Sequence, residues 1–143
     1  MYCAMRSERE GVKIEINSVN HRRLETAGNA LTRLCHGIAL QSGWWSNPAT
    51  ADPIKRNTGE MLMLIVTEIA EAMEGHRKDL MDDKLPHRKM LEVELADAVI
   101  RIFDLAGSKG FCLGATIAEK LHYNLTRADH KPEARLADGG KKC

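Results

Sequence analysis

The sequence predicts an all-α protein, a compact bundle of four to five helices. The composition is aliphatic, with 43% hydrophobic but only 4% aromatic residues, which favours helices over sheets. Apolar residues recur at helical spacing in four separate segments. Residues typical of helix ends, chiefly Asn, Gly and Pro, separate these segments. A chain of 143 residues suits one domain.

The first predicted helix begins after Asn17-Ser18, because either residue is a good N-cap, and it extends to about Gln41. Gly43 ends it. Its apolar stripe comprises Leu24, Ala27, Leu31, Leu34 and Ile38. A loop over residues 43–57 follows, rich in turn-forming residues.

The second predicted helix runs from Thr58 to about Arg77, with a stripe of Leu62, Ile65, Ile69 and Met73. After a break at residues 82–86, Asp83 suits an N-cap and Pro86 suits the first turn of a third helix. That helix reaches Leu105-Ala106 and stops at Gly107. Its stripe comprises Leu91, Leu95, Ala98, Val99, Ile102 and Leu105.

The fourth predicted helix follows Gly110, carries Leu113, Ile117, Leu121 and Leu125, and fades near Asp129-His130. The chain then divides into an N-terminal arm (1–17), a helical domain (18–131) and a flexible C-terminal tail (132–143). Within the arm, residues 12–16 alternate in polarity and suit either a short strand or an extended segment.

Charge and cysteine usage exclude several classes of protein. With 21 basic and 20 acidic residues the net charge is +1, so no basic surface for nucleic acid is expected. The four cysteines form no C-x-x-C pair, which argues against zinc and favours free thiols. We expect neither a signal peptide nor a membrane partner.

Four acidic residues stand in two short motifs: Glu68 and Glu71 in EIAE, then Glu94 and Asp97 in ELAD, 22 residues further on. Residues three apart share one face of a helix, so each motif aims two carboxylates in one direction. Two such helices packed together concentrate negative charge, which requires a counter-charge. Hard divalent cations with oxygen ligands, Mg²⁺ above all, match this requirement.

Residues 58–106, TGEMLMLIVTEIAEAMEGHRKDL through LEVELADAVIRIFDLA, resemble the MazG-like all-α nucleoside triphosphate pyrophosphohydrolases. E-x-x-E followed after a variable hinge by E-x-x-D is the mark of that family. The resemblance implies a MazG-like bundle that cleaves the α–β bond of a (d)NTP to give (d)NMP and pyrophosphate. It covers residues 55–130.

The resemblance implies that Glu68, Glu71, Glu94 and Asp97 are catalytic and hold Mg²⁺, with Mn²⁺ as a substitute. Phosphoryl transfer depends on positioning and charge neutralisation, which suits a metal held by carboxylates. Which of the four acids accepts the proton of the attacking water stays open.

The segment KLHYNLTR, residues 120–127, is similar to a K-x-x-Y-N-x-x-R segment of the same family. Lys120, Asn124 and Arg127 share one helix face, where they would contact phosphate oxygens or the sugar, with Tyr123 beside them. An ordinary polar face is the alternative. The C-terminal residues 139–142, GGKK, are similar to a glycine-lysine tail of some relatives, and an unstructured tail is the alternative.

The loop over residues 43–57 carries both tryptophans, and in relatives the equivalent segment helps to line the base pocket. Trp44 or Trp45 is expected to stack on a base and Asn57 to read a base edge, with His36 nearby. The alternative is that one tryptophan fills the end of the bundle. Two adjacent tryptophans do not easily both enter a core, so we expect one to be exposed or at a subunit contact.

Two rival functions stay open from the sequence. A carboxylate-bridged di-iron bundle protein needs E-x-x-H on two helices, and this chain has one, Glu119-x-x-His122. A non-catalytic nucleotide-binding helical regulator is the other rival.

Small helical relatives complete their core by dimerisation, and some pair dimers into tetramers. The resemblance therefore implies a homo-dimer or tetramer with its nucleotide site near the subunit contact. The chain looks like the compact stand-alone members of phages and bacteria. This implies a role in nucleotide-pool control or house-cleaning in the cytoplasm, the host's if phage-encoded, with a purine such as dGTP as substrate.

Overall fold

The computed structural model describes residues 17–136, and in this range it is all-helical, as predicted. Four main helices follow one another: α1 (Ser18–Gln41), α2 (Thr58–Lys78), α3 (Met90–Ser108) and α4 (Leu113–Thr126). A 3₁₀ turn, η1 (Ala128–His130), and a short helix, α5 (Pro132–Leu136), complete the described chain. The expectations for residues 1–16 and for the GGKK segment lie outside it.

Side-chain caps set the starts of α1, as its sequence predicts, and of α2. The side chain of Asn17 accepts hydrogen bonds from the backbone N–H groups of Val19 and Asn20. Asn57 does the same for Gly59 and Glu60. Each cap satisfies N–H groups that have no partner within the helix. After α1 the chain turns through Gly43, whose φ of 79° favours glycine.

The third helix begins later than predicted. Pro86 lies in the loop between α2 and α3 and not in the first turn of α3, which starts at Met90. The reason is the side chain of Asp82, whose Oδ1 accepts from the backbone N–H groups of Lys84 and Leu85, at 3.0 and 2.5 Å. This carboxylate organises a turn that holds residues 83–88 out of the helix.

The predicted flexible tail also needs correction at its start. Residues 132–136 form α5. Glu133 lies in the first turn of α5, where a negative charge interacts favourably with the helix dipole. The rest of the predicted tail, residues 137–143, lies outside the described residues.

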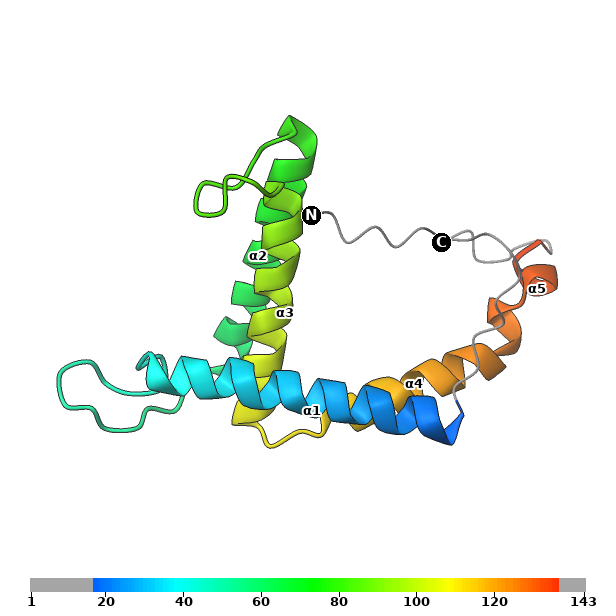
Figure 1. Ribbon diagram of the computed structural model, residues 1–143, viewed down its shortest axis with the longest axis horizontal. Helices are drawn as coiled ribbons and strands as arrows, with labels where there is room; N and C mark the ends of the chain where they lie inside the picture. The colour runs from blue at the N-terminus through cyan, green and yellow to red at the C-terminus, as the bar shows by residue number, and fades with distance from the viewer. Residues whose placement is uncertain (1–16, 137–143) are drawn as a thin grey trace.

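The helices pack in two pairs, as Figure 1 shows. α2 and α3 form an upright antiparallel hairpin, α1 packs across the lower end of α3, and α4 lies along α1 and extends away from the hairpin. The two pairs are joined where α1 crosses α3: a Cβ atom on Gly107 would lie 2.5 Å from the Cβ of His36. Glycine therefore permits this close crossing. Within the described chain, no helix is long and apolar enough to cross a membrane.

The facing positions of α2 and α3 form what we term the hairpin seam: Glu68, Ala72 and Gly75 on α2, with Glu94 and Ala98 on α3. All five are buried. Their spacing of three and four residues is that of a helix-packing stripe. The seam therefore combines small residues, which allow close approach, with two carboxylates.

Most of the large residues in the predicted apolar stripes of α2 and α3 do not enter the core within one chain. We term the outer apolar face the side chains of Leu62, Val66, Ile69 and Met73 on α2 and Leu95, Val99 and Ile102 on α3. These side chains are between 39% and 57% exposed. The correction arises because α2 and α3 meet through the seam, so the larger aliphatic residues face outward.

Candidate metal centre

The hairpin seam places carboxylates where a helix pair ordinarily has apolar side chains. Glu68 is 6% exposed and Glu94 is 8% exposed. Burying an ionised carboxylate is costly unless a cation or hydrogen-bond donors compensate its charge. Arg101 offsets this cost in part at Glu68. Two carboxylates buried side by side still indicate a role beyond packing.

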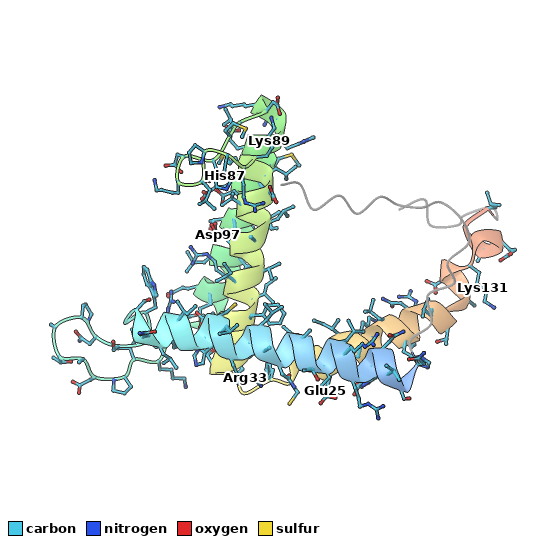
Figure 2. The ribbon with its side chains drawn as sticks, in the orientation of Figure 1. Glu25, Arg33, His87, Lys89, Asp97 and Lys131 are labelled. Atoms are coloured by element: carbon cyan, nitrogen blue, oxygen red, sulfur yellow. The ribbon has the colours of Figure 1, made fainter. Side chains whose placement is uncertain are left out.

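Three of the four predicted acids come together. Glu68, Glu94 and Asp97 each present a carboxylate oxygen, and these oxygens all lie within 4.8 Å of one another. Figure 2 shows Asp97 about midway along the hairpin, below His87 and Lys89 of the connecting loop. Oxygen ligands converging in this way suit a hard divalent cation.

The fourth predicted acid, Glu71, is exposed and lies outside this triad, but it lines the same cavity. The cavity has a volume of about 450 Å³ and opens between α2, α3 and the loop that joins them. We term it the acidic cavity. Six acids line it: Glu68, Glu71, Asp82, Asp83, Glu94 and Asp97.

Burial, together with the surrounding negative charge, raises the pKa of two of these acids. Burial, a hydrogen bond with Glu68 and the charges of Glu71, Glu68 and Asp97 raise the pKa of Glu94 to about 7. Burial, and then the charge of Glu68, raise the pKa of Asp97, while Arg101 lowers it. Without a cation, the site therefore holds a proton near neutral pH. A bound divalent cation would replace that proton.

Arg101 supplies a positive charge in the acidic cavity, and the sequence prediction missed it as a site residue. Its Nε donates to Glu68 Oε1 at 2.5 Å. The side chain of Arg101 is 43% exposed, whereas that of Glu68 is 8% exposed. Its position four residues after Asp97 on α3 is the signal that could have found it.

Asp82 is a second missed residue. It is 6% exposed and lines the acidic cavity while its side chain holds the turn after α2. Its negative charge also contributes to the raised pKa of Asp97. The turn sequence Asp82-Asp83-Lys84-Leu85 contains the signal, since Asp side chains commonly bind backbone N–H groups two or three residues ahead.

A second cavity adjoins the acidic one. It has a volume of about 530 Å³, and residues of α1, α2 and α3 line it together with Trp44 and Arg56 of the loop. We term it the apolar cavity because Ile38, Ala39, Leu64 and Ile100 form much of its wall. Asp97 and Arg101 line both cavities. A ligand with an apolar end and an anionic end could therefore occupy the two together.

The predicted loop residues have three different roles. Trp44 is 66% exposed, which confirms that one tryptophan of the pair is outside the core, and it lines the apolar cavity. Trp45 is half-buried and donates from Nε1 to Asp104, as does His36 from Nδ1. Asn57 lines neither cavity, and its side chain caps α2, which accounts for this residue without a base contact.

The residues predicted to contact phosphate lie on α4 or, for Arg127, directly after its end, and they lie close together but not at the acidic cavity. Lys120 Nζ lies 4.7 Å from the ring centroid of Tyr123, and the Arg127 guanidinium lies 5.8 Å from it. Oδ1 of Asn124 is buried, without a hydrogen-bond partner in the described chain. No residue of α4 lines the acidic or the apolar cavity among the residues described. One copy of the chain therefore does not bring this face to the acids.

Fold and site together define the class: an all-α protein with a buried acidic cluster suited to a divalent cation, next to an apolar cavity. No protein-family model, curated protein or solved structure matches the chain.

Proposed function

We propose that this chain is a Mg²⁺-dependent nucleoside triphosphate pyrophosphohydrolase that converts a (d)NTP to (d)NMP and pyrophosphate. The observation that carries the proposal is the convergence of Glu68, Glu94 and Asp97 within 4.8 Å at the border of an apolar cavity. The resemblance of residues 58–106 to the MazG-like enzymes supports it. Such an activity belongs in the cytoplasm, where nucleoside triphosphates and Mg²⁺ are abundant.

The donor set fits Mg²⁺, or Mn²⁺ in its place, because it consists of carboxylate oxygens alone. A bound cation would neutralise phosphate oxygens and lower the pKa of a water molecule. Glu68, Glu94 and Asp97 would hold the cation. Glu71, exposed on the rim of the same cavity, completes the predicted set of acids.

Substrate orientation follows from the two cavities. The triphosphate belongs in the acidic cavity, because only a cation-loaded acid cluster accepts that much negative charge. The base and sugar belong in the apolar cavity, where exposed Trp44 offers a face for stacking. Arg101 and Asp97 line both cavities, so they lie where the scissile phosphates would pass.

A second copy of the chain is part of the proposal. The outer apolar face exposes seven large aliphatic side chains over two helices, which one copy does not cover. Large apolar side chains exposed along two packed helices are typical of a contact between proteins. Dimerisation, or a tetramer of dimers, would bury it and could bring Lys120, Asn124, Arg127 and Tyr123 of one copy to the acids of another.

The catalytic test compares two substitutions on α3. Glu94→Gln should reduce pyrophosphate release in Mg²⁺ by at least about 100-fold, because it removes a charged ligand from the buried cluster. Glu92→Gln is the matched control, since Glu92 is exposed and pairs with Arg88. Circular dichroism would show that both variants keep their helices. Full release by Glu94→Gln would overturn the proposal.

The same measurements separate the rival functions. A nucleotide-binding regulator would bind (d)NTP in Mg²⁺ without releasing pyrophosphate. A di-iron protein would show visible absorption with iron. The described acidic cluster contains no histidine, and Glu119 and His122 lie on α4, away from both cavities, which disfavours the iron site.

The subunit arrangement is tested by complementation. Light scattering at micromolar concentration should give the mass of a dimer or tetramer. Mixing inactive Glu94→Gln with a Lys120→Ala/Asn124→Ala variant should restore part of the activity if α4 of one copy serves the acids of the other. Absence of restoration in a proven mixed dimer would show that α4 of one copy does not serve the acids of the other.

A further inference from the structure

Asp104 on α3 is a buried carboxylate in the wall of the apolar cavity, and the metal chemistry does not use it. The residue is 9% exposed. Its Oδ1 accepts two hydrogen bonds, from His36 Nδ1 at 2.8 Å and from Trp45 Nε1 at 2.9 Å. Its other oxygen, Oδ2, has no hydrogen-bond partner within residues 17–136.

The two donors fix the orientation of this carboxylate. His36 comes from α1 and Trp45 from the following loop, and their rings meet edge to face at 5.4 Å and 78°. Arg56, which also lines the apolar cavity, lies 5.7 Å from the centroid of Trp45. The carboxylate is therefore a positioned acceptor in a wall that is otherwise largely apolar.

The charge of Asp104 acts within the cavity. Burial, and then the charge of Asp104, raise the pKa of Cys35, another residue of the cavity wall. A negative group here repels phosphate and attracts N–H donors. The anionic end of a ligand is thus directed away from Asp104 and toward Arg101.

The spacing along α3 matches the length of a nucleoside. Asp97, Arg101 and Asp104 stand at i, i+4 and i+7, so they share one face of the helix. Seven residues rise by about 10 Å. A nucleoside with its first phosphate spans such a distance, with its base at Asp104 and its phosphate near Arg101 and Asp97.

We propose that Asp104 determines base specificity by accepting N–H donors from the base, and that it selects guanine; this rests on the proposed function of the same site. Guanine presents N1–H and the 2-amino group side by side, so both donors can face one carboxylate. Adenine and cytosine place an unprotonated ring nitrogen beside their amino group, which repels the carboxylate. Thymine and uracil flank their N–H with two carbonyl oxygens.

Arg56 adds a second element of the same selection. Guanine carries two acceptors, O6 and N7, which arginine commonly contacts. With Arg56 and Asp104 in one cavity, the wall offers donors and an acceptor to complementary parts of a single base.

The test compares nucleotides that differ by the 2-amino group alone. Wild-type protein should hydrolyse dGTP with a kcat/KM at least about tenfold above that for dITP, because the lost contact is a hydrogen bond to a charged group. The ratio of kcat/KM for dGTP to that for dATP should be larger than the ratio for dGTP to dITP. Asp104→Asn should abolish the dGTP preference and raise the relative rate with dATP, because the amide can donate to N1 of adenine.

A purely structural Asp104 would lower activity with every base equally, so the reversal toward dATP distinguishes the two roles. Equal kcat/KM for dGTP and dITP in the wild type would overturn the inference and leave the proposed function standing.

A binding measurement without metal or turnover separates the inference from the proposed function. By titration calorimetry, wild-type protein should bind dGMP at least about tenfold more tightly than dIMP. If no nucleotide releases pyrophosphate but this ratio holds, the proposed function fails and the base selection stands. Equal binding of dGMP and dIMP would overturn the selection.

Discussion

The hairpin of α2 and α3 and the pair of α1 and α4 are both close helix contacts, but their contact positions hold different residues. α1 meets α4 through Gly28 and Gly114, with Ala118 fully buried nearby. The hairpin meets through its seam, where Glu68 and Glu94 stand among small residues. The small residues between α1 and α4 allow close packing. The buried carboxylates between α2 and α3 lower stability, as charged groups in ion-binding sites commonly do.

The contact of α1 with α4 is where a small change should have the largest effect. A Cβ atom on Gly28 would lie 2.4 Å from Gly114 Cα, so Gly28→Ala forces the backbones apart. We expect a loss of about 3 kcal/mol in the free energy of unfolding. Gly37→Ala on the same helix meets nothing within 4 Å and should stabilise by about 0.5–1 kcal/mol.

Chemical denaturation at one fixed protein concentration would measure both alanine variants, since an oligomer's stability depends on concentration. A Gly28→Ala variant as stable as Gly37→Ala would show that the two helices do not approach as closely as described.

The hairpin seam should respond in the opposite direction. The double substitution Glu68→Met/Glu94→Leu removes two buried acids, so metal-free protein should gain about 2 kcal/mol in unfolding free energy at neutral pH. The variant should also lose all stabilisation by added Mg²⁺. Glu92→Leu, at an exposed position of α3, is the control for added apolarity. A large loss of stability in the double variant would contradict a seam retained for binding.

The pH dependence of stability follows from Glu94, whose pKa is raised from 4.5 to about 7 in the folded chain. Between these two values the folded state holds a proton that the unfolded state has released. The unfolding free energy of metal-free protein should therefore fall by about 2–3 kcal/mol as the pH rises from about 5 to about 8. Thermal unfolding across that range would measure it.

Two controls sharpen the pH experiment. Added Mg²⁺ should reduce the dependence of the unfolding free energy on pH, because the cation takes the place of the proton. Glu94→Gln should reduce the same dependence without metal. A slope that persists unchanged in this variant would assign the titration to another group.

Substitution of Arg101 should give the smallest effects: tighter binding of metal but weaker binding of nucleotide. Arg101→Gln frees Glu68 from its ion pair, so Mn²⁺ should bind the nucleotide-free protein a few-fold more tightly. If the nucleotide binds as proposed, the same change should raise its KM about tenfold, because Arg101 would no longer contact a phosphate. Titration of Mn²⁺ and steady-state kinetics would measure the two quantities. Weaker metal binding by the variant would show that Arg101 supports the acids.

Local interactions made much of the fold predictable. Asn17 caps α1 as its residue type indicates, and Gly43 follows the end of α1. The cap at the start of α2 was not predicted, because Asn57 was assigned to the base pocket. The spacing of EIAE and ELAD correctly placed Glu68, Glu94 and Asp97 together. The start of α3 was wrong because the side chain of Asp82 organises a turn there.

The candidate site was predictable only where its residues belong to a short motif. Arg101 and Asp104 were missed because their partners are remote: Glu68 is 33 residues from Arg101, and His36 is 68 residues from Asp104. The apolar stripes predicted for α2 and α3 lie on helices, but most of their large residues are exposed and do not enter the core. Which side of each helix became buried depended on how α2 and α3 packed against each other.

The sequence by itself determined the helices, their caps and the pairing of acids along each motif, because these depend on contacts within one or two helical turns. The tertiary structure decided which residues these acids contact. Closing the hairpin buries Glu68 and Glu94, brings Arg101 to them and leaves the outer apolar face uncovered. Crossing α1 over α3 sets Asp104 between His36 and Trp45. Such contacts join distant segments, so their geometry depends on how the helices pack and not on any local pattern of residues.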